Sequence, residues 1–448
     1  MGGGGLMQLV AYGAQDIYLT GNPQITFFKV VYRRHTNFAM ENIVQTFSGD
    51  PRFGSRATVI VSRNGDLINS AYLRVHLPSL SVDDWTFNTM SPSGTKDDYE
   101  LVWTNFVGLA LIYHVAVEIG GQEIDKHYGL WMYIWQELTM TSEKIQGYKR
   151  MVGGVDAAGW LNLGNSAQPQ ELHVPLDFWF NINAGLSLPL IALQYHEVRF
   201  VFQFRELTDL VYVVNKTEGF ILDPDQWSLV NKNAVIGGKE MIELYLDYIY
   251  LDTDERRRFA QMSHEYLIEQ VQHNESSVEI KPGANNLRLT FNHPCKEIIW
   301  VYQRSDNADY NDWFNFSAAG PAEEKYGPDL LDKAVLRLNG HYRFTPSRSP
   351  LFFRQWQPFI HHTRIPDSNL YLYSFALRPE EHQPSGTCNF SRIDNTNLEF
   401  YLNAADPVSP VVNTTLKKLS KSASVFVYAR NYNVLRIMSG MGGLAYSN

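Results

Sequence analysis

Hydrophobic and polar residues alternate with a period of two along much of this 448-residue chain. The clearest runs are Val198–Phe204, Ile242–Tyr248, Leu287–Phe291 and Leu398–Leu402. Successive side chains of a strand point to opposite faces, so each run predicts a strand with one apolar face on a core. Turn-forming pairs such as Asn64-Gly65, Gly120-Gly121 and Asn339-Gly340 separate the runs. The pattern predicts an all-β chain.

The number of expected strands points to a particular architecture. In the first half we expect strands near 37–47, 56–62, 66–77, 110–119, 171–180, 190–196, 198–205 and 241–251. Eight antiparallel strands in two Greek keys make a jelly roll, and the second half carries a similar pattern. We therefore expect two consecutive eight-stranded antiparallel jelly rolls with short helices in the connections. Long loops are expected at 78–101, 140–170, 206–238 and 304–330.

A weak internal repeat supports two equivalent halves. Val117-x-Ile119-x-Gly121 recurs as Leu336-x-Leu338-x-Gly340, and Val198-x-Phe200-x-Phe202 recurs as Leu398-x-Phe400-x-Leu402. Apolar alternation also repeats by chance in β proteins, so the repeat alone is only suggestive.

The clearest helical signal begins near Thr253 and ends near Met262, between the two strand-rich halves. Asp252 or Thr253 can cap the first amides, and acidic residues occupy the first turn. We interpret this helix as a linker. The expected division is an N-terminal arm at 1–24, a first jelly roll at 25–252 and a second jelly roll at 253–448 that starts with the linker helix. The arm, rich in glycine, is expected to become ordered against neighbouring proteins.

Composition and charge narrow the class of protein. The chain is 44% hydrophobic and 19% charged, with a net charge of −9. A protein that coats DNA directly carries a basic stripe, but the longest basic run, Arg256–Arg258, follows three nearby acidic residues. Direct binding to nucleic acid is therefore disfavoured. No stretch reaches the roughly 18 apolar residues of a membrane-spanning helix. Two cysteines, Cys295 and Cys388, indicate a reducing compartment.

The residues indicate no catalytic, cofactor-binding or metal site. No His-x-His pair occurs, and the adjacent His361 and His362 would point to opposite faces of a strand. The glycine-rich segment 440–443 lacks the Lys-Ser/Thr of a phosphate loop and predicts a flexible tail. Five Asn-x-Ser/Thr sequons occur, of which the loop-borne Asn215 and Asn315 are the candidates for glycosylation.

Several long segments together resemble one known family. They are Gln8–Asp16, Tyr18–Lys29, Val31–Ala39, Ile119–Asp125, Leu186–His196, Asp247–Phe259, Ser374–Pro379, Gln383–Gly386 and Asn431–Arg436. These segments resemble the major capsid proteins of nucleocytoplasmic large DNA viruses, in a chlorovirus-like form. They run from residue 8 to near the end of the chain, so the resemblance covers nearly all of it.

The resemblance implies a structural protein and not an enzyme. It implies that two jelly rolls lie side by side and that three chains form a pseudo-hexagonal capsomer, with capsomers tiling an icosahedral shell over an inner membrane. Expected partners are other copies of the chain, neighbouring capsomers, and minor capsid and penton proteins that contact the arm and the capsomer base. The expected location is the shell of a virion assembled in the host cytoplasm, with no cofactor and no transmembrane segment.

Three other functions stay open at this stage. Jelly rolls also make carbohydrate-binding proteins, and five tryptophans in the first half can stack on sugars: Trp85, Trp103, Trp131, Trp135 and Trp160. A cupin-type enzyme is disfavoured because the expected metal ligands are missing. A minor capsid or penton protein would share the fold class but not the full-length resemblance.

Overall fold

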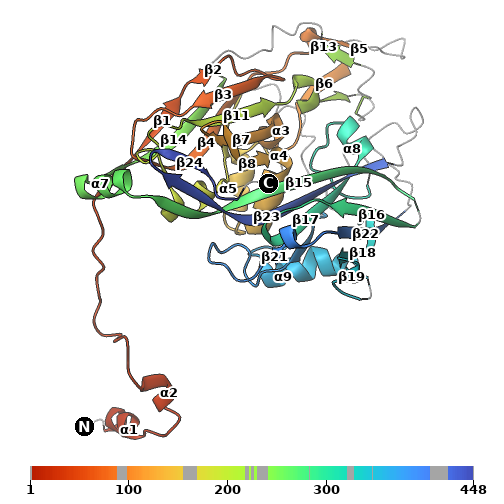
Figure 1. The fold of residues 1–448 in the computed structure, drawn as a ribbon. Helices are drawn as coiled ribbons and strands as arrows, with labels where there is room; N and C mark the ends of the chain where they lie inside the picture. The colour runs from red at the N-terminus through yellow and green to blue at the C-terminus, as the bar shows by residue number, and fades with distance from the viewer. Residues whose placement is uncertain are drawn as a thin grey trace. The chain divides into compact units, whose positions relative to one another are not determined.

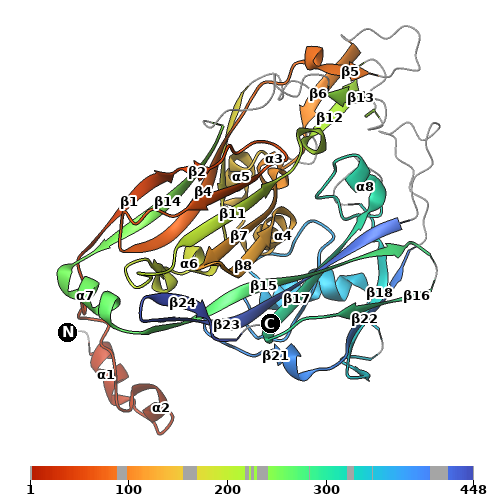
Figure 2. The ribbon, with the colours of Figure 1, turned by 45° about the horizontal axis from the view of Figure 1, so that its top comes forward.

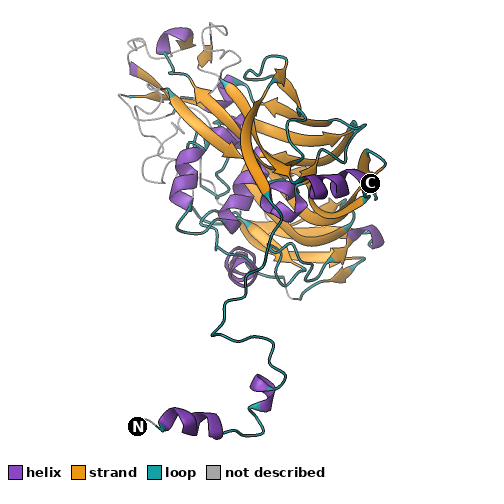
Figure 3. Ribbon diagram, turned by 90° about the vertical axis from the view of Figure 1, so that its left-hand side faces the viewer, coloured by secondary structure: helices purple, strands orange, loops and turns teal. Residues whose placement is uncertain are grey.

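The computed structural model describes residues 3–87, 98–154, 169–216, 221–222, 227–229, 241–281, 283–319, 327–345, 347–403 and 422–446. Contacts divide the chain into a small unit, Met1–Asn37, and a large unit, Phe38–Asn448. The small unit contains the helices α1 (Gly4–Val10) and α2 (Ile17–Thr20), and neither helix has a buried residue. The large unit consists mainly of strands, drawn in orange in Figure 3, with short purple helices between them.

The first sheet pair, β1 to β14, consists of two facing antiparallel sheets. One sheet has the order β1-β14-β4, and both β9 and β10 pair with β4. Its strands are β1 (Phe38–Gln45), β14 (Ile242–Leu251), β4 (Leu67–Leu77), β9 (Gln170–Pro175) and β10 (Leu188–Pro189). The other sheet has the order β2-β3-β11-β7-β8. Its strands are β2 (Phe47–Ser48), β3 (Arg56–Ile60), β11 (Val198–Phe204), β7 (Ile112–Ile119) and β8 (Gln122–Tyr128).

The second sheet pair, β15 to β24, repeats this arrangement. One sheet has the order β15-β23-β17-β20, with β21 on β17 and β24 on β23. Its strands are β15 (His264–Glu279), β23 (Ser422–Met438), β17 (Pro294–Arg304), β20 (Tyr371–Ser374), β21 (Cys388–Asn389) and β24 (Met441–Leu444). The other sheet has the order β16-β22-β18-β19. Its strands are β16 (Ala284–Leu289), β22 (Thr396–Leu402), β18 (Leu331–Leu338) and β19 (His341–Tyr342). Figure 2 shows the two sheet pairs beside each other.

The two sheet pairs match strand for strand. The order β1-β14-β4-β9 corresponds to β15-β23-β17-β20, and β3-β11-β7-β8 corresponds to β16-β22-β18-β19. Each series contains the eight strands of a jelly roll. The two pairs of repeated sequence motifs fall on corresponding strands: one pair lies on β7 and β18, and the other on β11 and β22. The predicted double jelly roll is confirmed, and the repeat reflects corresponding strands.

Alternation along the strands builds the cores. In β4, Leu73 and Val75 are fully buried while Tyr72 and Arg74 between them are only partly buried. On the facing sheet, Phe200 and Phe202 of β11 are also fully buried. Each large side chain removed from water contributes about 1.5–3 kcal/mol, so the regular alternation fixes the register of the strands.

Two of the predicted elements were wrong, and a third was predicted too long. The expected strand at 190–196 is instead a turn after β10, in which Ala192 and Leu193 donate backbone hydrogen bonds to Pro189 and Leu190. The expected strand at 171–180 is present only as β9, which ends at Pro175; Leu176 still donates a backbone hydrogen bond to Ala71 of β4, and the chain then turns into the helix α6 (Trp179–Ile182). The tail predicted at 440–443 is not free, since Met441–Leu444 form β24 and pair with β23.

The helices are more numerous than the sequence indicated. The predicted linker helix is present as α7 (Thr253–Gln261), and the Asp252 side chain accepts a hydrogen bond from the Thr253 amide. Helices that were not predicted follow β8 and β19. They are α4 (Gly129–Thr139), and the π-helix η7 (Phe352–Trp356) that continues into α9 (Gln357–His361). Figure 1 shows α4 near β15 and β23, and α9 at the lower edge of the view.

The long loops expected from the sequence lie partly outside the described residues. Their described parts contain short regular elements. These are β5 (Trp85–Phe87), β6 (Tyr99–Trp103), α5 (Ile145–Met151), β12 (Val211–Asn215), β13 (Trp227–Leu229) and α8 (Ser305–Asp309). β5 pairs with β13 and β6 pairs with β12, so the loops of the first sheet pair extend it with small ribbons. The other short helices in the described part of the chain are α3 (Val107–Leu111), α6 (Trp179–Ile182) and the 3-10 helices η1 (Val82–Asp84), η4 (Ala184–Leu186), η5 (Leu207–Leu210) and η8 (Phe390–Arg392).

Candidate functional site: the interface between the two sheet pairs

The candidate residues for small-molecule chemistry do not assemble into a site. Within the described ranges, no three His, Cys, Asp or Glu side chains lie close enough to hold a metal ion together. The four described tryptophans considered for sugar binding are 0–6% exposed: Trp85, Trp103, Trp131 and Trp135. Trp160 lies outside the described residues. Buried rings cannot stack on a sugar from solvent, so these four offer no carbohydrate site.

The two sequons differ in accessibility. Asn215 is the last residue of β12 and is half-buried. Asn315 is only 1% exposed, and its amide nitrogen donates to Asp312 Oδ2 at 3.0 Å. Its Oδ1 accepts hydrogen bonds from the Ser317 amide and hydroxyl. A glycan on Asn315 would require this loop to open.

The two cysteines lie opposite each other in neighbouring strands. Cys295 of β17 and Cys388 of β21 are register partners, and both are free thiols. Burial raises the pKa of both thiols above the ordinary value. A neutral thiol is a poor nucleophile, so these residues serve as packing groups.

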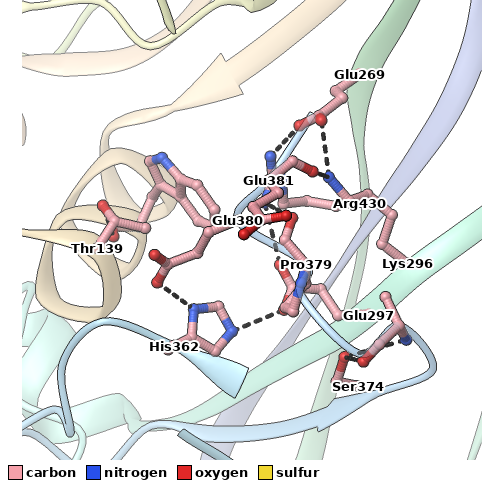
Figure 4. A network of polar contacts seen from close by, with 12 residues as sticks. Thr139, Glu269, Lys296, Glu297, His362, Ser374, Pro379, Glu380, Glu381 and Arg430 are labelled. Carbon is pink, nitrogen blue, oxygen red and sulfur yellow. Dashed lines mark hydrogen bonds and ion pairs between the residues drawn. The ribbon is translucent and has the colours of Figure 1, made fainter. Parts of the chain in front are cut away.

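The strongest concentration of buried charge lies where α4 meets the second sheet pair (Figure 4). Its central residue is Arg430 of β23, which is 3% exposed. The Arg430 guanidinium forms an ion pair with Glu269 of β15 and another with Glu297 of β17 at 3.3 Å. It also donates to the Pro379 carbonyl at 3.2 Å and lies over the Trp135 ring of α4, 3.8 Å from its centroid. Arg430 thus links β15, β17 and its own strand β23 to the helix α4.

Two further cations complete this buried ion network. Lys296 Nζ lies 2.7 Å from Glu269 Oε1 and donates to the Glu381 carbonyl at 3.0 Å. His362 follows α9, and its ring nitrogens lie 2.8 Å from Glu297 and 2.9 Å from Glu380. Since both nitrogens face carboxylate oxygens, both donate, and the imidazole is protonated. The network then contains three cations and the three carboxylates Glu269, Glu297 and Glu380, so its charges balance.

Titration properties follow from this balance. Burial acts to lower the pKa of His362, but the Glu297 carboxylate and hydrogen bonds to Glu297 and Glu380 raise it to about 9. Burial acts to raise the pKa of Glu269, but Arg430, His382 and Lys296 bring it down to about 2. Burial and Arg430 lower the pKa of Lys296 to about 8. Buried charges persist only when they are paired in this way.

The sequence interpretation of His361 and His362 needs correction. Neither lies on a strand, because His361 ends α9 and His362 follows it. Their side chains do separate: half-buried His361 hydrogen-bonds the Leu377 carbonyl, while the His362 side chain is fully buried in the network. The sequence did not single out Arg430, Glu269 or Glu297. Charged residues inside long apolar strands were the available signal, since such residues must be paired when buried.

A cavity of about 200 Å³ lies on the same interface, farther along β23. Residues of both sheet pairs line it, among them Tyr113 and Arg205 of the first and Trp313 and Tyr428 of the second. The Arg205 guanidinium lies 4.1 Å from the centroid of the Trp313 ring and donates to the Ala110 carbonyl at 2.7 Å. The interface therefore fixes one sheet pair against the other, and its groups serve cohesion rather than bond-making chemistry.

Comparisons with known proteins give matches along nearly the whole chain. The family described as "Major capsid protein N-terminus" matches residues 26–252, and the family described as "Large eukaryotic DNA virus major capsid protein" matches residues 255–443. The major capsid protein of Pyramimonas orientalis virus is 46% identical, with 100% of both chains covered. That of Paramecium bursaria Chlorella virus 1 is 40% identical over 99% of this chain and 100% of its own.

Solved structures agree with these sequence matches. A chain in the quasi-atomic PBCV-1 virus capsid superposes with a TM-score of 0.76 at 36% identity, over 94% of this chain and 100% of that one. The Faustovirus major capsid protein has a TM-score of 0.68 at 13% identity, over 95% and 94%, and so shares the fold. Proteins of this kind are structural components of capsids and not enzymes. The chain belongs to the major capsid proteins of large eukaryotic DNA viruses.

Proposed function

We propose that three copies of this chain form a capsomer with a pseudo-hexagonal outline, and that such capsomers tile the icosahedral shell of a large double-stranded DNA virus. The observation that carries the proposal is the strand-for-strand match between the two sheet pairs of one chain. Three chains supply six similar wall elements, which suits a position with six neighbours. The superposition on a chain of the PBCV-1 capsid over nearly the whole length supports the same role.

We propose that the chain is divided into an arm at 1–24, a first jelly roll at 25–252 and a second at 253–448. The order of the sheets supports the second boundary, since β14 closes the first sheet pair and α7 precedes β15. The small unit exposes many apolar side chains, which favours an arm that binds minor capsid and penton proteins near the capsomer base. Within the arm they are Leu6, Met7, Leu9, Val10, Tyr12, Ile17, Tyr18 and Leu19, and the small unit continues beyond the arm with exposed Ile25, Phe27, Phe28, Val30, Val31 and Tyr32.

The proposed place of the protein is the shell itself, assembled in the host cytoplasm beside an inner membrane and without a cofactor. Direct contact with the genome is disfavoured by the net charge of −9. The basic run on α7 gives little support for DNA binding, because Arg256 pairs with Asp66 at 2.7 Å. Among the described helices, none is both long and apolar enough to cross a membrane.

Light scattering on the purified chain tests this function. We expect a mass of about 154 kDa, three times the 51.4 kDa of one chain, and hexagonal outlines in negative-stain images. A stable monomer that gives a signal on a glycan array would contradict the capsomer and favour the carbohydrate-binding alternative. The burial of Trp85, Trp103, Trp131 and Trp135 argues against that alternative.

A further inference from the structure

The helices α4 and η7/α9 occupy corresponding places in the two sheet pairs. α4 follows the β7–β8 hairpin and precedes β9, while η7/α9 follows the β18–β19 hairpin and precedes β20. Since β7, β8 and β9 correspond to β18, β19 and β20, the two helical segments correspond as well. Corresponding elements with the same surroundings are expected to have the same burial, and these two segments do not.

α4 is buried against the other sheet pair of its own chain. Trp131 and Trp135 are 2% and 6% exposed. The Trp131 ring lies 5.3 Å from the Tyr428 ring of β23, and Arg430 of the same strand covers Trp135. The receiving surface is the outer face of the sheet β15-β23-β17-β20.

The segment η7/α9 instead exposes an apolar surface, which we call the α9 face. It consists of Leu351, Trp356, Phe359 and Ile360, which are 61%, 53%, 67% and 49% exposed, and of Leu377, which is 73% exposed. The opposite side of the segment is buried through Phe353, Gln357 and Pro358. Leu377 adjoins the helix because His361 hydrogen-bonds its carbonyl, and the rings of Trp356 and Phe359 stack.

The size of the α9 face indicates a protein partner. Five large apolar side chains exposed to this degree present about 500–700 Å², at the upper end of the largest patch on an ordinary monomer. A stable interface buries about 800 Å² on each partner, so this face supplies most of one side.

The sheet β15-β23-β17-β20 and its counterpart β1-β14-β4-β9 also differ in burial, and in the opposite sense to the two helical segments. In β17, Ile299 and Val301 pack toward the first sheet pair, while Ile298 and Trp300 pack into their own core. That sheet is therefore covered on both faces within one chain. The corresponding sheet β1-β14-β4-β9 has a covered inner face and an outer face where Met40 is 51% exposed.

This outer face is suited to receive an apolar helix. The rings of Tyr72 and Tyr245 stack on it at 5.1 Å with planes 4° apart. Beside them, Arg74 pairs with Glu171 at 2.9 Å and with Glu243 at 3.2 Å, and the Asp247 carboxylate accepts hydrogen bonds from Asn42 and Ser70, so these charged groups have polar partners within the chain. Aromatic rings next to partnered charges also form the surface that receives α4, with Tyr428 and Arg430.

We propose that the α9 face of one copy packs on the outer face of the sheet β1-β14-β4-β9 of a second copy. The contact between copies then repeats the contact that α4 makes inside one chain. The two surfaces differ, so the contact is heterologous, and a threefold rotation between copies closes it into the ring of the proposed trimer. This inference rests on the proposed trimeric capsomer and names the surfaces that build it.

Two double variants test the inference. Trp356→Glu with Phe359→Glu places charge on the α9 face, and Met40→Glu with Val44→Glu places charge on the outer face. Each variant is expected to lose the trimer, with a threefold fall in mass by light scattering and an unchanged circular dichroism spectrum. Tyr342→Glu is the matched control, since Tyr342 is 50% exposed elsewhere on the second sheet pair, and it should stay trimeric.

Mixing the two double variants gives the sharper readout. Each mixed pair retains one intact α9 face and one intact outer face, so dimers near 103 kDa, twice the 51.4 kDa chain, are expected only in the mixture. If one double variant fails to fold, the mass of the other double variant still tests the inference, and loss of its trimer supports it. Trimers that persist in a folded double variant would overturn this inference, leave the proposed capsomer intact and assign the α9 face to another protein. A wild-type monomer would overturn both.

Discussion

Replacing Arg430 by methionine is expected to destabilise the chain strongly. Methionine keeps much of the packing volume but leaves Glu269 and Glu297 buried without their shared cation, and the Glu297 side chain is fully buried. Removing one partner of a buried ion pair costs about 3–5 kcal/mol, mostly because the remaining charge stays desolvated. The urea dependence of the unfolding free energy grows with the surface exposed, and with about 3 kcal/mol/M the unfolding midpoint should fall by about 1–1.7 M.

A matched control lies six residues farther along the same strand. Arg436 pairs with Glu265 at 2.8 Å, and their side chains are 50% and 58% exposed. Exposed pairs contribute about 0–1 kcal/mol, so Arg436→Met should hardly move the midpoint. Urea unfolding followed by tryptophan fluorescence compares the two variants directly. Equal shifts in both would refute the reasoning that the buried network holds the sheet pairs together.

The pH dependence of the Arg430→Met defect provides a second readout. Arg430 is one of the groups that lower the folded-state pKa of Glu269 and Glu297, so its loss raises both pKa values relative to the wild type, while Lys296 and His362 still act to lower them. A carboxyl group with a raised folded-state pKa gains relative stability as the pH falls, because the proton removes the buried charge. The difference between wild type and variant should therefore be constant near pH 8 and shrink on acidification, as the two carboxyl groups take up protons in the variant. A difference that grows on acidification would show that the two carboxylates are not the source of the defect.

The other predictions concern a titration, a modification and a close contact. His362 has a pKa of about 9 in the folded chain. The protonated imidazole therefore stabilises the fold fully below about pH 6.5, and this stabilisation is lost as the pH rises through 9. The urea unfolding midpoint of His362→Gln should accordingly approach that of wild type between pH 7 and 10. Glycan mass on the virion protein should disappear in Asn215→Gln but not in Asn315→Gln, and an intact mass of 51.4 kDa would show that neither carries a glycan. A Cβ on Gly442 would lie 2.6 Å from Leu193 Cδ2, so Gly442→Ala should lower the unfolding free energy by about 1–3 kcal/mol, and an unchanged midpoint would contradict the tight contact.

The strands were predictable where one face meets a core and the other does not. β4, β11, β14 and β22 show this alternation in the sequence and occur where expected. β17 does not alternate, because both of its faces are buried, one in each core cluster. A strand of this kind reads as a continuous apolar run, which does not distinguish it from a buried helix.

The helices between the strands were missed for a related reason. α4 is apolar around nearly its whole circumference, with Gln136 and Glu137 also buried, so no polar side marks a helical period. The ion network was missed because its members come from positions such as Glu269, Glu297 and Arg430, far apart in the chain. Register between β15, β17 and β23 brings them together, and a single sequence does not reveal that register.

In each sheet pair the first strand pairs with a strand from the end of that series, and this has a consequence for synthesis on the ribosome. β1 pairs with β14, so the first sheet pair can close once residue 251 has emerged, while the second is still being made. β15 pairs along its whole length with β23, from His264 with Ile437 to Glu279 with Ser422. The second sheet pair must therefore wait for almost the last residues of the chain, and until then β15 keeps an open edge. Nascent chains are thus most prone to mispairing during the final third of translation, while that edge is open.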